Sequence, residues 1–428
     1  MLPAMKNATR HAVIALLATA VAANASAQPL ASRVDAAPPG YVQFSFAARA
    51  GVCGNGTSWI QTSPGNFSGT FTGSIGETLR TQACEPGPVR VLLDRADRTI
   101  IAIRTYVGPG TSMPAGTDLG RVTPQQGVDY LLGLAGSAEG RVGRDAIQPA
   151  TLADSVRIGA GLLAIARNRD LPRETRTTAL GALSRSADAP DPADLLALAR
   201  DETDNLQVRT QALSALGRLE HGAGLPLLSG LASQTGSLWL AKEAMDVVAA
   251  SGDPRAREYL RSAVQQGNLS DEALAVAIRA LGRQYATRRD SELLRSLYPR
   301  LTTDASREAV LNAMADAGGS ESVTWLLQLA RNEDENPARR RRAVDNASRA
   351  GAPIADLVAL YDGVTDQQLK LSLITVYARS GERAALDKLL SIAQTETNVN
   401  VRRRAISSLS DSSDPRVREV LRQIIIRS

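Results

Sequence analysis

From about residue 140 to the C-terminus, apolar residues recur at three- and four-residue spacing, which predicts amphipathic helices. A small residue marks the middle of every other predicted helix, and these small residues repeat at a nearly constant interval. They are Ala146, Ala179, Ala212, Ala244, Ala277, Ala309, Ala343, Ser372 and Ala405, separated by 33, 33, 32, 33, 32, 34, 29 and 33 residues. A period of this length is typical of helical repeats.

The intervening helices keep the same period. Each carries a pair of apolar residues: Leu162-Leu163, Leu195-Leu196, Leu227-Leu228, Tyr259-Leu260, Leu293-Leu294, Trp325-Leu326, Leu357-Val358, Leu389-Leu390 and Val420-Leu421. The small residue lets two helix backbones approach closely, while the flanking apolar residues fill the layer between neighbouring pairs. The pattern predicts a mainly α fold of about nine stacked helical hairpins, roughly 32 residues each.

Three of the turns within these hairpins share a short motif. Asp191-Pro192, Asp253-Pro254 and Asp414-Pro415 each place an aspartate N-cap before a proline at the first position of the second helix. We therefore expect the break between the two helices at these positions.

Upstream of the repeats the hydrophobic period changes to two residues. Alternation predicts three strands, at Val42, Phe44 and Phe46, at Val89, Val91 and Leu93, and at Ile101, Ile103 and Thr105. The last two are separated by the turn-like Arg95-Ala96-Asp97-Arg98, so we expect a hairpin there. We predict a small antiparallel β module over residues 41–107.

Residues 108–122 are dense in Gly and Pro and are predicted to form a linker. A helix start follows, with Thr123 as N-cap, Pro124 at the first helical position and Gln126 completing a capping box. We expect this helix to cover the open apolar end of the repeats, as terminal repeats require. The helical region would then span residues 123–428.

The first 27 residues have the features of a signal peptide. Lys6 and Arg10 form a positive n-region, residues 12–23 are almost wholly small or apolar, and Ala25-Ser26-Ala27 offers a cleavage site before Gln28. The alternative is an uncleaved membrane anchor, which needs roughly 18 or more apolar residues, and the apolar run is shorter. We expect a periplasmic or secreted product with no transmembrane segment.

The overall charge is small once this peptide is removed. Loss of Lys6 and Arg10 takes the formal net charge from +5 to +3. A mixed-sign surface of this kind argues against general nucleic-acid binding. Aromatic residues are only 4% of the chain, so the stacking platforms of single-strand binders are also scarce.

The two cysteines, Cys53 and Cys84, both lie in the predicted β module. In an oxidising compartment such a pair indicates one disulfide, closing a loop of about thirty residues and contributing roughly 3 to 4 kcal/mol. The competing interpretation is a metal site. Two thiols without a nearby histidine or further cysteine cannot complete a tetrahedral zinc shell.

Some first helices carry an arginine three residues before the small residue. Val208-Arg209 precedes Ala212 and Val401-Arg402 precedes Ala405, and Arg176 and Arg340 occupy the same position before Ala179 and Ala343. With these residues, the chain from about residue 140 to 428 resembles the bacterial HEAT-like repeats of the phycobilin-lyase type. The resemblance implies a right-handed α-solenoid of about nine HEAT-like helical hairpins.

The resemblance also implies partners for these arginines. In that family the arginine bonds an acidic residue of its hairpin, so Asp170 would serve Arg176, Asp334 would serve Arg340 and Glu396 would serve Arg402. Five repeats depart from the pattern, with Gly143, Ala241, Leu274, Ser306 and Leu369 in this position. The family pattern is specific for fold and weak for function, because solenoids of this kind bind many unrelated partners.

Catalytic chemistry has little support in the sequence. After residue 27 the one histidine is His221, in the polar turn Glu220-His221-Gly222, and no nucleophile partner is indicated by spacing. We interpret it as a solvated loop histidine. We expect no catalytic residue, no metal site and no cofactor.

Two basic runs stand out, Arg339–Arg342 and Arg402–Arg404, both at the start of first helices, where positive charge opposes the helix dipole. One interpretation is a solvated face neutralised by Glu333, Asp334 and Glu335. The other is a surface for an anionic partner. Its candidate binding residues are Arg339, Arg341, Arg342, Arg403 and Arg404.

Taken together, these patterns favour an exported, non-enzymatic scaffold. We expect it to bind a protein or peptide on the surface of the solenoid, and to be a monomer that binds no nucleic acid. The alternative is a chromophore lyase or other enzyme that uses the solenoid as a platform, because some relatives of this type attach bilins.

The predicted disulfide leads to a first test. Reduction should loosen the β module while helical circular dichroism is largely kept, because repeat stability is a sum of local and nearest-neighbour terms. Reduction and ellipticity can be followed in one titration. A single-step collapse of helicity on reduction would show that the two parts do not unfold independently.

Overall fold

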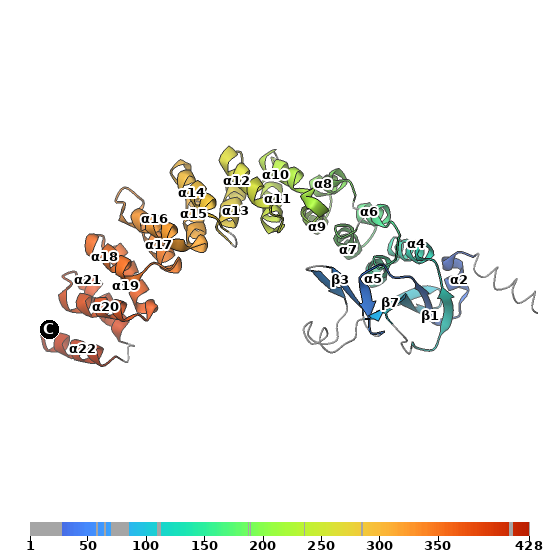
Figure 1. The fold of residues 1–428 in the computed structure, drawn as a ribbon, viewed down its shortest axis with the longest axis horizontal. Coiled ribbons are helices and arrows are strands. Elements are labelled where there is room, and N and C mark those ends of the chain that lie inside the picture. Colours follow the sequence, from blue (N-terminus) through green and yellow to red (C-terminus); the bar gives the residue numbers. More distant parts are fainter. Residues whose placement is uncertain are drawn as a thin grey trace, which may run out of the picture. The chain divides into compact units, whose positions relative to one another are not determined.

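The computed structural model describes residues 28–56, 59–63, 66–69, 85–108, 113–186, 188, 190–234, 236–283, 286–410 and 414–427 (Figure 1). The described chain is mainly helical, with β-structure near its beginning. It divides into two compact units, Met1–Gly224 (unit 1) and Leu225–Ser428 (unit 2). The predicted signal peptide, residues 1–27, lies outside the described residues, so its cleavage stays a prediction.

The main sheet of unit 1 has the strand order β7-β6-β1-β8. Its strands are β1 (Gly40–Phe46), β6 (Val89–Ala96), β7 (Thr99–Val107) and β8 (Thr117–Arg121). The predicted hairpin is confirmed as β6 and β7, joined through Asp97 in the left-handed region at φ 52°. One expectation was wrong, because part of the linker 108–122 forms β8, which pairs in parallel with β1 and makes the sheet mixed. Among the described strands of the predicted module, residues 41–107, the pairings are antiparallel as predicted.

A second sheet has the order β4-β3-β2-β5. It consists of β2 (Val52–Gly54), β3 (Trp59–Ser63), β4 (Asn66–Gly69) and β5 (Glu85–Pro86). Cys53 lies in β2 opposite Pro86 of β5. Cys84 lies outside the described residues, so the Cys53–Cys84 pairing stays a prediction.

The predicted capping helix is α4 (Pro124–Ala135), and its capping box is present. The Gln126 backbone N–H donates to the Thr123 hydroxyl, and the Thr123 N–H donates to the Gln126 side chain. The helix packs against β1 as well as against α5 (Gly140–Ala150), and a short helix that the sequence pattern did not indicate, α2 (Leu30–Ala36), packs on it.

Aromatic side chains fix the contact between α4 and the main sheet. The rings of Phe44 and Tyr130 meet edge-on with centroids 5.9 Å apart. A Cβ atom at Gly127 would lie 2.6 Å from the Phe46 ring, so α4 approaches the sheet this closely because it has glycine there. The β module is therefore part of the same core as the first helices of unit 1.

The helices from α5 onward alternate as the period predicts. Unit 1 contains α5, α6 (Gly159–Arg167), α7 (Arg173–Leu183), α8 (Pro192–Arg200) and α9 (Leu206–Gly217). Unit 2 contains α10 (Leu225–Gln234), α11 (Leu238–Ala250), α12 (Ala256–Gln266), α13 (Asp271–Gly282), α14 (Arg288–Leu297), α15 (Asp304–Ala317), α16 (Gly319–Arg331), α17 (Pro337–Arg349), α18 (Ile354–Gly363), α19 (Gln367–Ser380), α20 (Arg383–Thr395), α21 (Val399–Leu409) and α22 (Pro415–Arg427).

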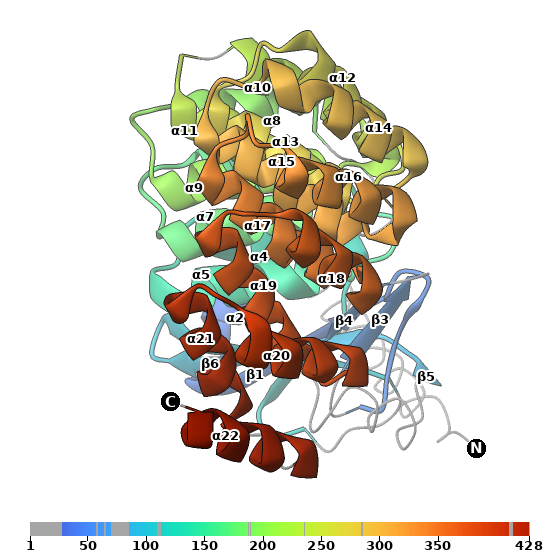
Figure 2. The ribbon, with the colours of Figure 1, turned by 90° about the vertical axis from the view of Figure 1, so that its left-hand side faces the viewer.

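Within each unit, the first helix of one hairpin contacts the first helix of the next. In unit 1 this joins α5, α7 and α9, and in unit 2 it joins α11, α13, α15, α17, α19 and α21. In unit 2 the second helices contact one another from α10 to α14 and from α16 to α22, and second helices also contact the first helix that follows them. Figure 2 shows α17, α19 and α21 on one side of unit 2 and α16, α18 and α20 on the other.

A helix starts at the predicted proline in two of the three Asp-Pro turns. The side chains of Asp191 and Asp414 accept hydrogen bonds from the backbone N–H two residues on, and α8 and α22 start at the proline that follows. Asp253 makes the same hydrogen bond, but α12 starts only at Ala256. None of the described helices is long and apolar enough to cross a membrane.

The predicted column of small residues lies in the core. Its eight alanines are at most 2% exposed. Ser372, the ninth member, is half-buried. In α19 the consecutive residues Leu373 and Ile374 are fully buried, where the other first helices have the small residue and the residue after it, so the predicted register was wrong by one position there. The helices cross closely. A Cβ atom at Gly282 of α13 would lie 2.3 Å from the Ala313 carbonyl oxygen of α15.

The buried arginines of the first helices bind the helix before them. The Nε atoms of Arg176, Arg209 and Arg340 donate to the carbonyl oxygens of Ala166, Ala199 and Ala330, at 2.9, 3.0 and 3.0 Å. Each acceptor lies in the last turn of a second helix, where carbonyl groups lack helical partners and a cation is favourable. The arginine thereby fastens one hairpin to the next.

The carboxylates that the family resemblance assigned to these arginines were wrong. Arg176 forms a two-pronged ion pair with Asp204, of the loop after the next helix, and not with Asp170. Arg402 donates to the backbone oxygen of Glu396, whose carboxylate instead accepts from Tyr361 and Lys370.

The close crossing of first helices predicts a position-specific effect in unit 2. Ala309 is 2% exposed, whereas Ala305, one turn earlier in α15, is exposed. Ala309→Leu should cost about 1 to 3 kcal/mol through overpacking, and the matched control Ala305→Leu should change stability by no more than about 0.5 kcal/mol. Hydrogen exchange should show lost protection in α13 and α17. Equal effects of the two variants, or protection lost equally in α21, would contradict the assigned helix faces.

Candidate functional site

The predicted arginine patch lies on two first helices of unit 2. Arg339 pairs with Glu335 at 2.7 Å and with Asp304, and Arg342 pairs with Glu308 at 2.5 Å. Of the three acidic residues expected to neutralise the first run, Glu335 does so. Asp304 and Glu308 belong to the preceding hairpin, so their role was not visible from sequence proximity.

The remaining patch residues, Arg341, Arg403 and Arg404, form no ion pair among the described residues. Arg404 donates to the Thr375 hydroxyl at 3.3 Å. Among the residues that the structure describes, Arg341 and Arg403 form no ion pair. They lie on α17 and α21, which both contact α19 between them, and Arg403 is exposed.

His221 lies where the sequence indicated, in a short 3-10 turn over Glu220–Gly222. It is exposed and adopts a left-handed backbone conformation at φ 54°. The described residues contain no group of three or more His, Cys, Asp or Glu side chains placed to hold a metal ion.

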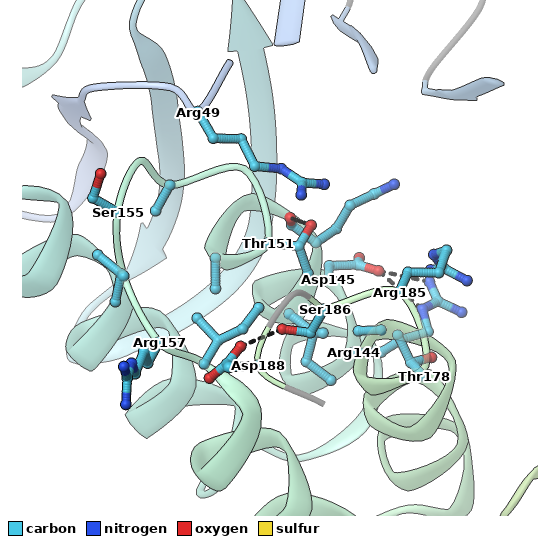
Figure 3. Close-up of a pocket in the computed structure, with 17 residues that line it drawn as sticks. Arg49, Arg144, Asp145, Thr151, Ser155, Arg157, Thr178, Arg185, Ser186 and Asp188 are labelled. Carbon is cyan, nitrogen blue, oxygen red and sulfur yellow. Dashed lines mark hydrogen bonds and ion pairs between the residues drawn. The ribbon is translucent and has the colours of Figure 1, made fainter. Parts of the chain in front are cut away.

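A cavity of about 840 Å³ lies within unit 1 (Figure 3). Its walls come from the segment around Arg49, from helices α5 and α7, and from the loops that follow these two helices. The walls are partly apolar, with Ile147, Val156 and Ile158 among them. Arginines from four of these segments also line it, Arg49, Arg144, Arg157 and Arg185, and the sequence analysis had singled out none of them.

Backbone pairing builds one side of this pocket. Ala48 forms an antiparallel bridge with Ala153, the Arg49 N–H donates to the Leu152 oxygen at 2.9 Å, and the Asp154 N–H donates to the Ala47 oxygen at 3.0 Å. The loop after α5 then turns through Ser155, in the left-handed region at φ 55°. These bonds hold the Arg49 segment against the first helical hairpin.

The carboxylates in the pocket already have partners. Asp145 accepts from its neighbour Arg144 at 2.8 Å. Asp188 accepts from the Gly159 N–H at 2.7 Å and from the Ser186 hydroxyl. Both acidic groups are therefore engaged within the protein.

Two arginines of the pocket, Arg49 and Arg185, differ from these carboxylates because they have no partner of opposite charge among the described residues. Within the described part of unit 1, neither Arg49 nor Arg185 forms an ion pair, and the buried Nε of Arg49 has no hydrogen-bond partner. Burial lowers the pKa of the Arg49 guanidinium, and the positive charge of Arg185 lowers it further. The Arg185 residue is exposed as a whole, but partial desolvation of its guanidinium, together with the charge of Arg218, also lowers its pKa.

In Figure 3 the Arg49 guanidinium points toward the side of the pocket where Arg144 and Arg185 lie, and Arg157 lies at the opposite side. Positive charge is thus concentrated over a partly apolar wall, and the local carboxylates do not neutralise it. Such a wall lowers the local dielectric and strengthens the field on an incoming ligand.

Comparison with known proteins gives no family. No family model and no curated protein matches the chain. Among solved structures, human deoxyhypusine hydroxylase is similar at 17% identity and a TM-score of 0.26, over 57% of this chain and 96% of that one. Similarities this weak support no inference about activity.

Two larger solved proteins are also similar. Lipovitellin matches at 12% identity with a TM-score of 0.43, over 89% of this chain and 45% of that one. Legionella pneumophila aminopeptidase A matches at 10% identity with a TM-score of 0.27, over 91% and 49%. This chain spans about half the length of each, and these likenesses carry no argument either.

The uncompensated charge in the pocket should cost stability. Arg185→Gln removes repulsion with Arg49 and loses no described side-chain hydrogen bond, so the melting temperature of the ligand-free protein should rise. The rise should shrink with added salt, which screens charges beyond about 10 Å at 0.1 M. Calorimetry at two salt concentrations measures it. The control Arg98→Gln, in the exposed β6–β7 turn, should change little. A melting temperature below that of the unaltered protein would contradict the repulsion.

Proposed function

We propose that this chain is an exported, non-enzymatic scaffold built as a right-handed HEAT-like α-solenoid, and that unit 2 binds an acidic protein or peptide. The observation that carries the proposal is the continuous layer of first helices, α11 to α21, each in contact with the next. Stacked helical repeats of this type offer extended surfaces for protein partners.

The HEAT-like assignment is supported by three features already described. The 18 helices from α5 to α22, all within the described residues, follow the repeat period. Eight alanines of the small-residue column are buried. An arginine of the first helix binds the end of the preceding second helix in three repeats.

The charge pattern of the layer favours an acidic partner. Ion pairs between neighbouring first helices, such as Glu308 with Arg342 and Asp345 with Arg379, neutralise much of its surface. Arg341 and Arg403 have no such partner among the described residues. An acidic side chain of a bound protein would pair with them and steer the association.

Export rests on the N-terminal sequence. The positive n-region, the apolar run and the Ala25-Ser26-Ala27 site favour a signal peptide, which would deliver the protein to the periplasm or the medium. A partner is therefore sought among envelope or secreted proteins.

Affinity capture from the native envelope tests the proposal. The purified protein, the double variant Arg341→Glu/Arg403→Glu and the control Arg418→Glu are immobilised in parallel, and bound proteins are identified by mass spectrometry. Arg418 is exposed on the second helix α22. The double variant should retain about tenfold less of the partner, equivalent to about 1.4 kcal/mol, while the control retains it.

Two results would contradict the proposal. One is a partner that binds the double variant as well as the unaltered protein. The other is turnover of a hydrolase substrate or attachment of a bilin that persists through extensive purification, which would favour the enzyme alternative.

A further inference from the structure

The pocket of unit 1 has features of a ligand site that the scaffold function does not require. It holds about 840 Å³, within the range of roughly 300 to 1,000 Å³ typical of small-molecule sites. It combines an apolar wall with a few polar groups, which is the usual composition of such sites. Its position in unit 1 makes it independent of the first-helix layer of unit 2.

Two arginines of this pocket, Arg49 and Arg185, lack the partners that other arginines of the unit have. Other arginines of this unit have a partner within the protein, as Arg176 has in Asp204 and as Arg144 has in Asp145. Arg49 and Arg185 instead face one pocket without a described counter-charge, and the buried Nε of Arg49 donates to nothing. An unpaired buried donor is costly, so a bound acceptor would recover that cost.

We propose that this pocket binds an organic monoanion, with a carboxylate between Arg49 and Arg185 and a small apolar body against Ile147, Val156 and Ile158. The planar guanidinium fork matches a carboxylate in two-pronged geometry.

A carboxylate fits the site better than a phosphate dianion. The pocket contains the fixed negative charges of Asp145 and Asp188, and both are already engaged. Inorganic phosphate has no apolar body to lie against Ile147, Val156 and Ile158, so it would leave this part of the wall uncovered. The hydroxyl of Thr178, which also lines the pocket, is a neutral donor suited to the second carboxylate oxygen, whereas the Thr151 hydroxyl already donates to the Gln148 oxygen.

The carboxylate can belong to a free small acid or to the C-terminus of a peptide, and the probes separate these sources. Hexanoate, hexanol and inorganic phosphate form the first set. The second set is acetyl-Ala-Leu with a free C-terminal carboxylate and the same dipeptide with a C-terminal amide. Each is titrated into the full-length purified protein by calorimetry at low salt.

We expect a carboxylate probe to bind, and its uncharged counterpart and phosphate to bind at least about tenfold more weakly. Binding of hexanoate identifies a free acid as the source, and tighter binding of the acidic dipeptide identifies a peptide end. Arg185→Gln should weaken the carboxylate by about tenfold or more and flatten the salt dependence. Arg98→Gln should leave the affinity unchanged.

Arg49→Gln adds a second test of the same kind, and circular dichroism establishes whether that variant folds. Arg185 is exposed, so its replacement can be interpreted whether or not the Arg49 variant is folded. The proposal is overturned if no carboxylate binds, if hexanol or phosphate binds as tightly as hexanoate, or if Arg185→Gln retains the full affinity. None of these outcomes depends on whether unit 2 binds a protein.

Discussion

Two backbone hydrogen bonds, between Arg49 and Leu152 and between Ala47 and Asp154, hold the Arg49 segment of the β module against the first helical hairpin of unit 1, in addition to the packing of α4 and α5 on the main sheet. This short pairing constrains everything around the pocket. It sets the path of the loop after α5 and places the Arg49 side chain over the helices. Without this pairing the strands of the main sheet would still pair with one another. The Arg49 side chain, however, would not be fixed in position to line the same cavity as Arg185.

The repeats obey a different and simpler constraint, which is the close approach of successive first helices. Alanine at the crossing permits it, and glycine does so where the backbones nearly touch, as Gly282 does against Ala313. The buried arginines then satisfy carbonyl groups that the ends of the second helices leave exposed. Because each contact involves only neighbouring hairpins, charges on the outer surface can vary without disturbing the core.

Features that depend on local spacing could be predicted from the sequence. The helical period, the alanine column, the capping box at Thr123 and the β6–β7 hairpin are of this kind. Strand β8 was missed because Thr117–Arg121 lacks apolar alternation and is held by pairing with β1. Ser372 was placed one position away from the buried Leu373 because its repeat is shorter than the others.

The sites were harder to predict, because their residues come together only in three dimensions. Arg176 pairs with Asp204, 28 positions later, and Arg342 with Glu308 of the previous hairpin. The arginines of the pocket each stand alone in the sequence, with no motif around them. Only Arg49 has no acidic residue close to it in the sequence, whereas Arg144, Arg157 and Arg185 each have an aspartate within three positions, so no signal in the sequence selects this set.

The most direct test is amide hydrogen exchange at Arg49 and Asp154, the two donors that join the β module to the helices. The structure predicts that both are protected to a degree similar to the amides of β6 and α4. Exchange of both at the rate of an unstructured peptide, while β6 and α4 remain protected, would show that the Arg49 segment is not held against the hairpin and that the pocket is not preformed.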